Sequence, residues 1–410
     1  MEGARIMEQP PGAEAPGTAT AVAFEGRRAS LVGIVLKNLL LNVLTVGIYR
    51  FWAKTRLRRF FWSGISIGGE RLEYTGKGSE LFIGFLIVVA ILVPFTLAYQ
   101  LIDGLSVGLP TPARLALLAA YYLALGFLVE VAVFRARRYR LTRTLWRAVR
   151  FDQVGSSFSY ALVAFAQRLL SLATLGMTEP WRALVLQRRL VRATRFGDQT
   201  FAFQGRTMAL ARWYWPAWLS FWSTVAVTVF ANADELLAVA KAISAYEVSR
   251  EHLPLKASPN LWPLAGLCIA WLLYARYQVK QYRYFANSIS LGATTAVSTI
   301  KTRRVLGYAF FYGLLNLTWV AVLIAIFIAA VNVADEGPGF AIPLLAGFVV
   351  LLWFTSPIIR IAWLLFPLVR ELCRTLKIRN LEAVENIVQS HRASPSYGEG
   401  LADVLDVGGL

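Results

Sequence analysis

The sequence predicts an all-α polytopic membrane protein. We expect six transmembrane helices in three hairpins, two re-entrant or interfacial segments, small cytoplasmic β elements and an internal pseudo-repeat. Of the 410 residues, 57% are hydrophobic and only 16% are charged, whereas soluble domains carry about a quarter charged residues. The formal net charge is nevertheless +18. Apolar spans that alternate with short basic cytoplasmic loops account for both values.

The first segment, residues 1–23, is rich in Pro, Gly, Ala and Glu and is expected to be a disordered tail. It lacks the basic region and short apolar core of a signal peptide. The first membrane-directed segment is therefore expected to be internal.

Six apolar runs are long enough to cross about 30 Å of hydrocarbon at about 1.5 Å per residue. They are residues 81–102, 113–134, 213–233, 261–280, 305–333 and 340–369. Two shorter runs, 31–49 and 158–177, are ambiguous because they contain polar side chains. These side chains are Lys37, Asn38, Asn42, Gln167 and Arg168. A Lys or Arg at a helix centre costs about 2.5–3.5 kcal/mol on insertion scales.

The distribution of positive charge favours six spans over eight. Residues 53–80, 135–157 and 178–212 hold six, seven and seven Lys or Arg, whereas 103–112 and 334–339 hold none. If 158–177 crossed the membrane, two loops with seven positive charges each would face opposite compartments, against the positive-inside rule. We therefore predict that both short runs enter and leave from the cytoplasmic side, with both termini cytoplasmic.

The sequence predicts an internal repeat at a constant, ungapped offset. This first offset pairs Thr45 with Thr174, Gly47 with Gly176, Trp52 with Trp181, and Arg59 with Arg188. A second, larger offset gives a weaker copy and pairs Arg59 with Arg283 and Gly68 with Gly292. The predicted units are 24–134, 135–280 and a partial 281–369, followed by a cytoplasmic tail, 370–410.

The common unit is predicted to be a basic helix followed by a short β element. ISIGGERLEYTG and RFGDQTFAFQG alternate around Gly-Gly and Gly-Asp, which are typical hairpin turns. AVAFEGR adds a third strand-like stretch. At three places in the sequence an aromatic residue is followed by any residue, then by glycine, then by a basic residue. We expect the glycines at these places, Gly26, Gly76 and Gly205, to supply a turn.

The same residues carry a family resemblance. LLLNVLTVGIYRFWAKTRLRRF (39–60), RTLWRAVRF (143–151) and LATLGMTEPWRALVLQRRL (172–190) resemble the YjgN-like family of bacterial inner-membrane proteins. The resemblance covers about 24–380 and departs from the pattern at Val46, where the family prefers Leu. It implies a multi-pass protein of the bacterial inner (plasma) membrane, and it implies no reaction.

The polar residues of the two short runs are the first candidate site. Ionisable groups in membrane segments are costly and usually functional. Lys37, Asn38 and Asn42, with Gln167 and Arg168, could contact an anionic solute or a lipid headgroup. The alternative is that both runs are interfacial amphipathic helices whose charges reach water.

Three arginines form a second candidate site. Arg143, Arg147 and Arg150, together with Trp146, would share one face if this stretch is helical, and could clamp a phosphate. Equally, they could serve only to set the topology.

Other polar and aromatic residues have ordinary structural interpretations. Trp52 and Trp181, beside Arg59 and Arg188, are expected to be interfacial anchors. Glu130 is expected to form a local ion pair with Arg135, five residues later.

The sequence favours no enzyme class. With two Cys, two His and no recognised catalytic or nucleotide-binding motif, neither a metal nor another cofactor is expected. Membrane topology explains the basic charge without nucleic-acid binding. The first interpretation is a transporter or channel for a small, anionic solute. The alternative is an anionic-lipid-binding or membrane-organising protein without catalysis. In either case the expected partners are the bilayer and its anionic inner-leaflet lipids, and nothing in the sequence indicates an oligomeric state.

Overall fold

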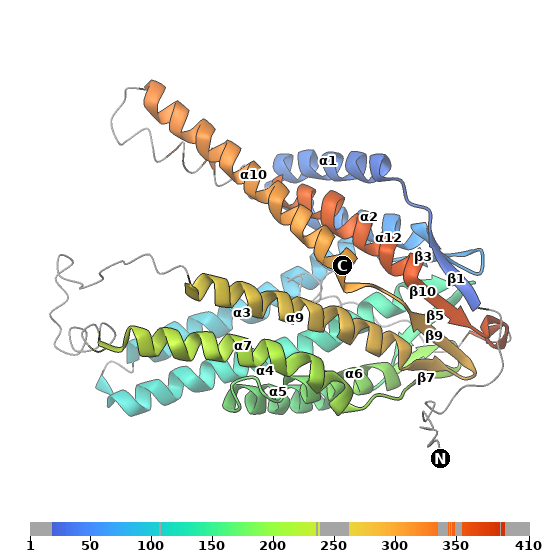
Figure 1. The fold of residues 1–410 in the computed structure, drawn as a ribbon, viewed down its shortest axis with the longest axis horizontal. Coiled ribbons are helices and arrows are strands. Elements are labelled where there is room, and N and C mark those ends of the chain that lie inside the picture. The colour runs from blue at the N-terminus through green and yellow to red at the C-terminus, as the bar shows by residue number, and fades with distance from the viewer. Residues whose placement is uncertain are drawn as a thin grey trace, which may run out of the picture.

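The computed structural model describes residues 19–105, 108–234, 237, 262–334, 343, 345, 347–348, 355–385 and 387–389. In these residues the chain is mostly helical, and ten short strands close into an antiparallel barrel. Figure 1 shows the strands at one end of the molecule and the helices extending from them. The prediction of an all-α protein with small β elements was therefore incomplete, because the β elements join into one closed barrel.

Four β-hairpins of equal dimensions build most of the barrel. Each has a three-residue strand, a two-residue turn and a five-residue strand. They are β2 (Ile65–Ile67) and β3 (Glu70–Tyr74), β4 (Thr144–Trp146) and β5 (Val149–Gln153), β6 (Thr194–Phe196) and β7 (Gln199–Phe203), and β8 (Ile289–Leu291) and β9 (Thr294–Ser298).

Positive φ angles make these turns tight. Gly68 and Gly69 have φ of 59° and 85°, and Arg147 and Ala148 have φ of 50° and 61°. Two positive φ angles in a two-residue loop match the right-handed twist of the flanking strands. In the other two turns the first residue, Gly197 or Gly292, has a positive φ. The hairpins at Gly-Gly and Gly-Asp were predicted from sequence, and the structure confirms both.

The two ends of the chain close the barrel. Strand β1 (Ala19–Phe24) pairs antiparallel with β10 (Leu376–Arg379), with Ala19 opposite Arg379, and its other edge pairs with β2. The sequence assigned residues 1–23 to a disordered tail but also predicted a strand-like stretch in AVAFEGR (21–27), and the structure shows a strand at Ala19–Phe24. This strand lies between β10, from near the other end of the chain, and β2.

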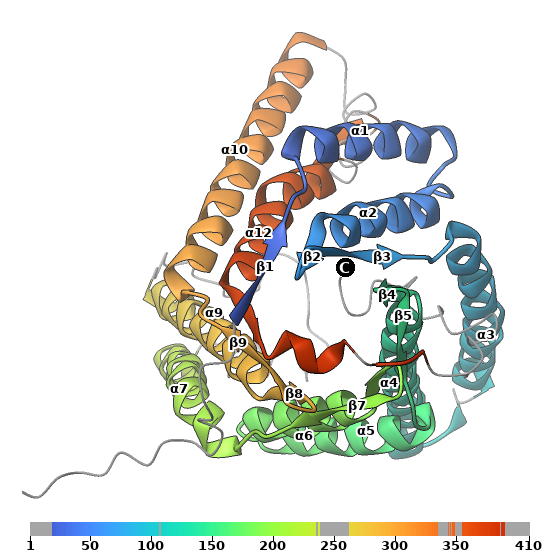
Figure 2. The same cartoon turned by 90° about the vertical axis from the view of Figure 1, so that its right-hand side faces the viewer.

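Pairs of helices connect successive barrel strands. They are α1 (Arg28–Leu44) with α2 (Arg50–Gly64), α3 (Gly78–Leu105) with α4 (Thr111–Thr142), α5 (Ser157–Ala173) with α6 (Glu179–Arg192), α7 (Thr207–Ala231) with α9 (Trp262–Asn287), and α10 (Thr302–Ala334) with α12 (Phe366–Thr375). A π-helix, η2 (Arg360–Leu365), runs directly into α12. Contacts between neighbouring elements run from α1 to α3 and from α4 through α9 and α10 to η2, which returns to α1. Helices α3 and α4 meet through the rings of Tyr99 and Tyr121. Figure 2 shows this ring of elements.

Three of these helices are long and apolar enough to cross a membrane, judged by length and composition within the described residues. They are Gly78–Gly104, Thr111–Thr142 and Thr302–Ala329. The predicted spans 213–233 and 261–280 lie largely on α7 and α9, which are helical but are not among these three. Much of the predicted span 340–369 lies outside the described residues.

The helices and strands recur at the same two offsets that the sequence shows. The offset that takes Thr45 to Thr174 moves the bounds of α1 onto those of α5, and the bounds of β2 and β3 onto those of β6 and β7. The offset that takes Arg59 to Arg283 moves the bounds of β2 and β3 onto those of β8 and β9. The offsets found in the sequence therefore join elements of equal type and length.

The glycines that follow the long strands do not act as predicted. Gly26, Gly76 and Gly205 are absent from the residues with positive φ, so they supply no left-handed turn. Instead, a Cβ on these glycines would lie 2.6, 2.6 and 2.7 Å from the ring of Phe24, Tyr74 and Phe203, respectively. Each ring folds back over the glycine two residues later. Glycine is required there because the ring approaches the backbone too closely for a side chain.

Candidate functional site

The two short apolar runs fold as helical hairpins. Helix α1 turns into α2 through residues 45–49, and α5 turns into α6 through 174–178. The turns match in conformation: Val46 and Gly47 have φ of 50° and 86°, and Leu175 and Gly176 have 50° and 85°. Both tips expose apolar side chains, with Val46 92% exposed. Each segment thus runs out from the barrel and returns, as the hypothesis of a re-entrant segment requires.

The predicted polar residues of the first hairpin do not gather at one point. Asn38 is buried between the two helices, where its amide nitrogen donates to the Ala53 carbonyl at 3.4 Å and its oxygen accepts from Arg56 at 3.4 Å. The Asn42 oxygen is buried without a hydrogen-bond partner. Lys37 is exposed. Asn38 therefore joins the helices, and Lys37 lies apart from it.

In the second hairpin, Arg168 is part of an ion pair. Its Nε donates to the Glu130 carboxylate on α4 at 2.6 Å, and the Glu130 side chain is 3% exposed. The expected pairing of Glu130 with Arg135 was wrong, because the packing of α4 on α5 presents Arg168 to the carboxylate instead. Gln167, the neighbour of Arg168, keeps a buried side-chain oxygen without a partner.

Arg143, Arg147 and Arg150 do not share a helical face, so that prediction was also wrong. The stretch is the β4–β5 hairpin, with Arg147 and Ala148 in the turn. Arg143 donates to the Glu80 carboxylate at 3.0 Å, whereas the Arg147 guanidinium lies 3.9 Å from the Glu385 carboxylate. The turn contains neither Gly nor Asn, so the sequence carried no turn signal, and the spacing of the arginines resembled that of a helix.

The C-terminal segment, described at 380–385 and 387–389, was missed as a candidate, and it closes one end of the barrel. It contains a 3-10 helix, η3 (Leu381–Val384), drawn in red inside the ring in Figure 2. Leu381, Val384 and Ile387 form one hydrophobic cluster with residues from seven barrel strands. Those residues are Ile67, Leu72, Trp146, Val149, Phe151, Phe196, Phe201 and Leu291. The apolar residues at every third position of 381–387 were the signal in the sequence.

The segment contacts the turn of each of the four hairpins. The Thr294 hydroxyl donates to the Asn380 carbonyl at 2.8 Å. A Cβ at Gly68 would meet Leu381, and one at Gly197 would meet Ile387 and the Val388 carbonyl. Glu385 lies beside Arg147, as described above. Since these turns lie at the end of the barrel opposite the helices, the segment closes the end that points away from the helical region.

The opposite end of the barrel interior carries polar atoms without protein partners. Gln153 is two residues beyond Phe151 on β5, so it faces the same side of the strand. It is 2% exposed, and neither atom of its amide has a hydrogen-bond partner. The Ser298 hydroxyl is also buried without a partner. Buried polar groups normally have a partner, so these atoms mark where water or a solute would bind.

The predicted interfacial anchors lie next to the barrel. Arg59 and Arg188 donate to the carbonyls of Gly76 and Gly205, each at 2.9 Å, and so tie α2 and α6 to the segments that follow β3 and β7. Trp52 and Trp181 are 36% and 41% exposed. The two arginines thus have structural roles in addition to their charge.

The part of the chain that the structure describes contains no group of three or more His, Cys, Asp or Glu placed to hold a metal ion. Its polar features are instead ion pairs between helices, a closed barrel end and unpaired groups inside the barrel.

Comparison with known proteins agrees with a membrane setting. The chain is 27% identical over 129 residues to "Inner membrane protein YjgN" of Escherichia coli O157:H7, covering 31% of this chain and 29% of that protein. It is 34% identical over 68 residues to the protein of the same name from Salmonella typhimurium, covering 17% of each. The alignments thus span less than a third of these relatives. No solved structure matches the chain.

A match over a much larger part of the chain decides the family. Residues 19–404, which include every described helix and strand, match the family described as "Bacterial protein of unknown function (DUF898)". The chain belongs to the DUF898 family.

Proposed function

We propose that this protein is a channel or transporter for a small, anionic solute, with the barrel interior as the cytoplasmic end of its path. The observation that carries the proposal is the C-terminal segment, which closes the end of the barrel that lies opposite the helices. The segment continues from β10 without being a strand of the wall, so it would act as a plug that can leave while the wall stays closed.

The size of the barrel supports this interpretation. About eight strands leave an interior that the side chains of the wall just fill. With ten strands the interior is wider, and here Leu381, Val384 and Ile387 occupy the additional space. Beyond them, the unpaired amide of Gln153 and hydroxyl of Ser298 would line the path once the segment moves.

The same proposal includes a topology. The barrel and both termini would lie in the cytoplasm of a bacterium, three long helix pairs would provide six spans of the inner membrane, and the two short hairpins would enter and return. The basic loops support this orientation, since anionic inner-leaflet lipids attract Lys and Arg. The exposed apolar tips at Val46 and Leu175 support insertion of the short hairpins. The equal element lengths at the two sequence offsets support an origin by internal duplication.

Flux measurements test the plug. The protein is reconstituted in liposomes as two truncations, one lacking 380–410 and one lacking only 390–410, which leaves the described segment intact. We expect the longer deletion to raise efflux of labelled phosphate or acetate and the shorter one to leave it unchanged. Labelled rubidium reports charge selectivity, and gel filtration confirms that both proteins are folded. Equal efflux from the two truncations would contradict the proposal.

Cysteine labelling tests the topology, and it needs no replacement of Cys373. Cys373 is buried, and burial raises the pKa of its thiol to about 11, so we expect it to react much more slowly with maleimide than an exposed thiol. Cys268 is exposed and is replaced by Ser. Single cysteines are then placed at Leu109, Glu73 and Met177.

We expect position 109 to react with an impermeant maleimide in intact cells and position 73, on the barrel, to react only after permeabilisation. Position 177, at the tip of the second short hairpin, should be protected in intact cells. Labelling of position 177 from outside would mean that the short hairpins span the membrane. Labelling of position 73 from outside would mean that the orientation is inverted.

A further inference from the structure

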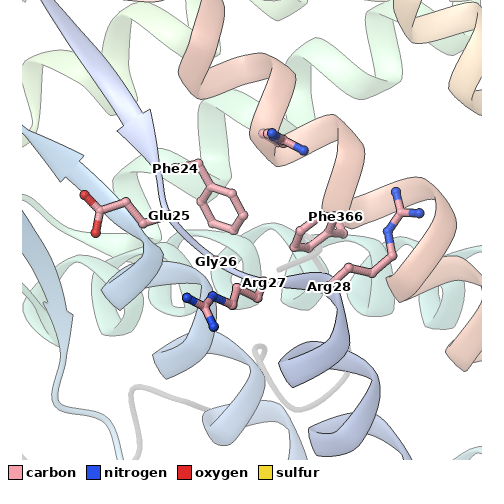
Figure 3. Close-up of a pocket in the computed structure, with 7 residues that line it drawn as sticks. Phe24, Glu25, Gly26, Arg27, Arg28 and Phe366 are labelled. Carbon is pink, nitrogen blue, oxygen red and sulfur yellow. The ribbon is translucent and has the colours of Figure 1, made fainter.

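An open cavity of about 570 Å³ lies where the two ends of the chain meet. It is lined by the segment between β1 and α1 and by α12. Three of its lining residues are arginines, Arg27, Arg28 and Arg370. Figure 3 shows the cavity with Phe24 and Phe366 between the charged side chains.

Comparison with the equivalent positions around the barrel shows that one contact is missing here. Three hairpins share one contact. An arginine six residues before the short strand donates to the backbone carbonyl of a glycine two residues after the long strand of the same hairpin. The pairs are Arg59 with Gly76, Arg138 with Gly155, and Arg188 with Gly205. Arg370 occupies the same position before β10, and its expected acceptor is Gly26 after β1. The structure shows no such bond, and both residues line the cavity instead. The Arg370 guanidinium is therefore left for another acceptor.

The charge of the cavity is not neutralised by the protein. Neither Arg27 nor Arg370 forms a side-chain hydrogen bond or ion pair with any described residue. The acid in the lining, Glu25, is paired with Arg71. Figure 3 shows the Glu25 carboxylate directed away from Arg28 and Phe366. Three arginines thus line a cavity whose lining acid, Glu25, is already paired with Arg71.

Neighbouring rings and the N-terminus of α1 fix the position and the positive potential of these groups. The Arg28 guanidinium lies over the rings of Trp363 and Phe366, at 4.7 and 5.4 Å from their centroids, which restricts its position. Arg27 is the N-cap residue of α1, where no side chain caps the helix and no acid lies in the first turn. The free backbone N–H groups of that turn add positive potential on the same side.

We propose that this cavity binds a phosphate group through Arg27, Arg28 and Arg370. Guanidinium groups donate paired N–H bonds that match the oxygens of phosphate, and a helix N-terminus favours the same anion. The cavity lies between the barrel and the start of the first membrane-directed helix, at the depth of lipid headgroups in the proposed topology. Either an anionic phospholipid or a soluble phosphate could supply the group. Binding here does not require passage of solute through the barrel.

Calorimetry on the purified full-length protein in detergent tests the proposal with three probes. They are inorganic phosphate, dioctanoyl phosphatidylglycerol and dioctanoyl phosphatidylcholine. The test variant combines Arg27→Gln, Arg28→Gln and Arg370→Gln. The matched control combines Lys77→Gln, Arg206→Gln and Lys301→Gln, which removes equal charge from exposed positions at the same level of other barrel hairpins.

We expect the wild type and the control variant to bind an anionic probe with equal affinity. The test variant should bind it about a hundredfold more weakly, because each basic residue near a lipid surface contributes about 1 kcal/mol and three are removed. Binding of phosphatidylglycerol without inorganic phosphate identifies a lipid headgroup as the source. Binding of inorganic phosphate identifies a soluble anion. Absence of anionic binding in the wild type, equal loss in the control variant, or equal affinity for phosphatidylcholine would overturn the proposal.

Discussion

Replacing Gly197 by Ala is expected to release the C-terminal segment from the barrel, whereas replacing Gly292 by Ala is not. Both glycines begin a hairpin turn, with φ of 58° and 56°. Alanine therefore costs about 1–2 kcal/mol of backbone strain at either position. The two positions differ in their surroundings. A Cβ at 197 would lie 2.6 Å from the Ile387 side chain and would also meet the Val388 carbonyl, whereas a Cβ at 292 would meet nothing within 4 Å.

This pair of variants separates plug displacement from turn strain. Overpacking a close contact costs about 1–3 kcal/mol, so the released state should be roughly tenfold more populated in the Gly197 variant alone. Limited digestion with trypsin, followed by mass spectrometry, measures this population through cleavage after Arg379, which borders the segment. If the barrel is the solute path, phosphate efflux should increase in the same variant. Equal cleavage in the two variants would show that the segment does not rest on the Gly197 turn.

Replacing Arg168 by Ala is expected to destabilise the protein by about 3 kcal/mol, because removal of one partner leaves the other charge buried and unpaired. That partner is Glu130, whose side chain is 3% exposed between α4 and α5. Lys37, the basic candidate in the first short hairpin, is exposed, so Lys37→Ala should change stability by no more than about 0.5 kcal/mol.

A double-mutant cycle with Glu130→Gln identifies the cause of this loss. If the unpaired carboxylate is responsible, the double variant should be more stable than Arg168→Ala alone, with a coupling of about 1–3 kcal/mol. Reversible unfolding of the detergent-purified protein measures all four proteins under one condition. Additive effects of the two substitutions would mean that the ion pair does not stabilise the packing of α4 on α5.

The hairpins of the barrel show how far the sequence predicts the fold. Turn residues at Gly68-Gly69 and Gly197-Asp198 identified two hairpins, because the turn chemistry is local. The hairpin at Arg147-Ala148 lacks this signal, and its arginines at helical spacing were taken for a helix. Strands of three to five residues are also too short for an alternating pattern to stand out.

The polar candidates show the same limit in the helical region. Sequence identified Asn38, Gln167 and Arg168 as unusual residues in apolar segments. Which side chain is paired depends on the neighbouring helix, as with Arg168 and Glu130, 38 positions apart. Positions in the chain cannot supply that information, because the contact arises from packing between α4 and α5.

The sequence by itself determined the membrane character, the positions of the long apolar helices and the two offsets at which similar elements recur. These properties follow from composition and short-range periodicity. Only the tertiary structure decided that the β elements form one barrel, that 380–389 closes it, and that Arg370 lacks the acceptor that Arg59 and Arg188 have. Each of these features joins residues that are far apart in the chain. Long-range pairing depends on how the whole chain closes, and therefore local patterns did not reveal it.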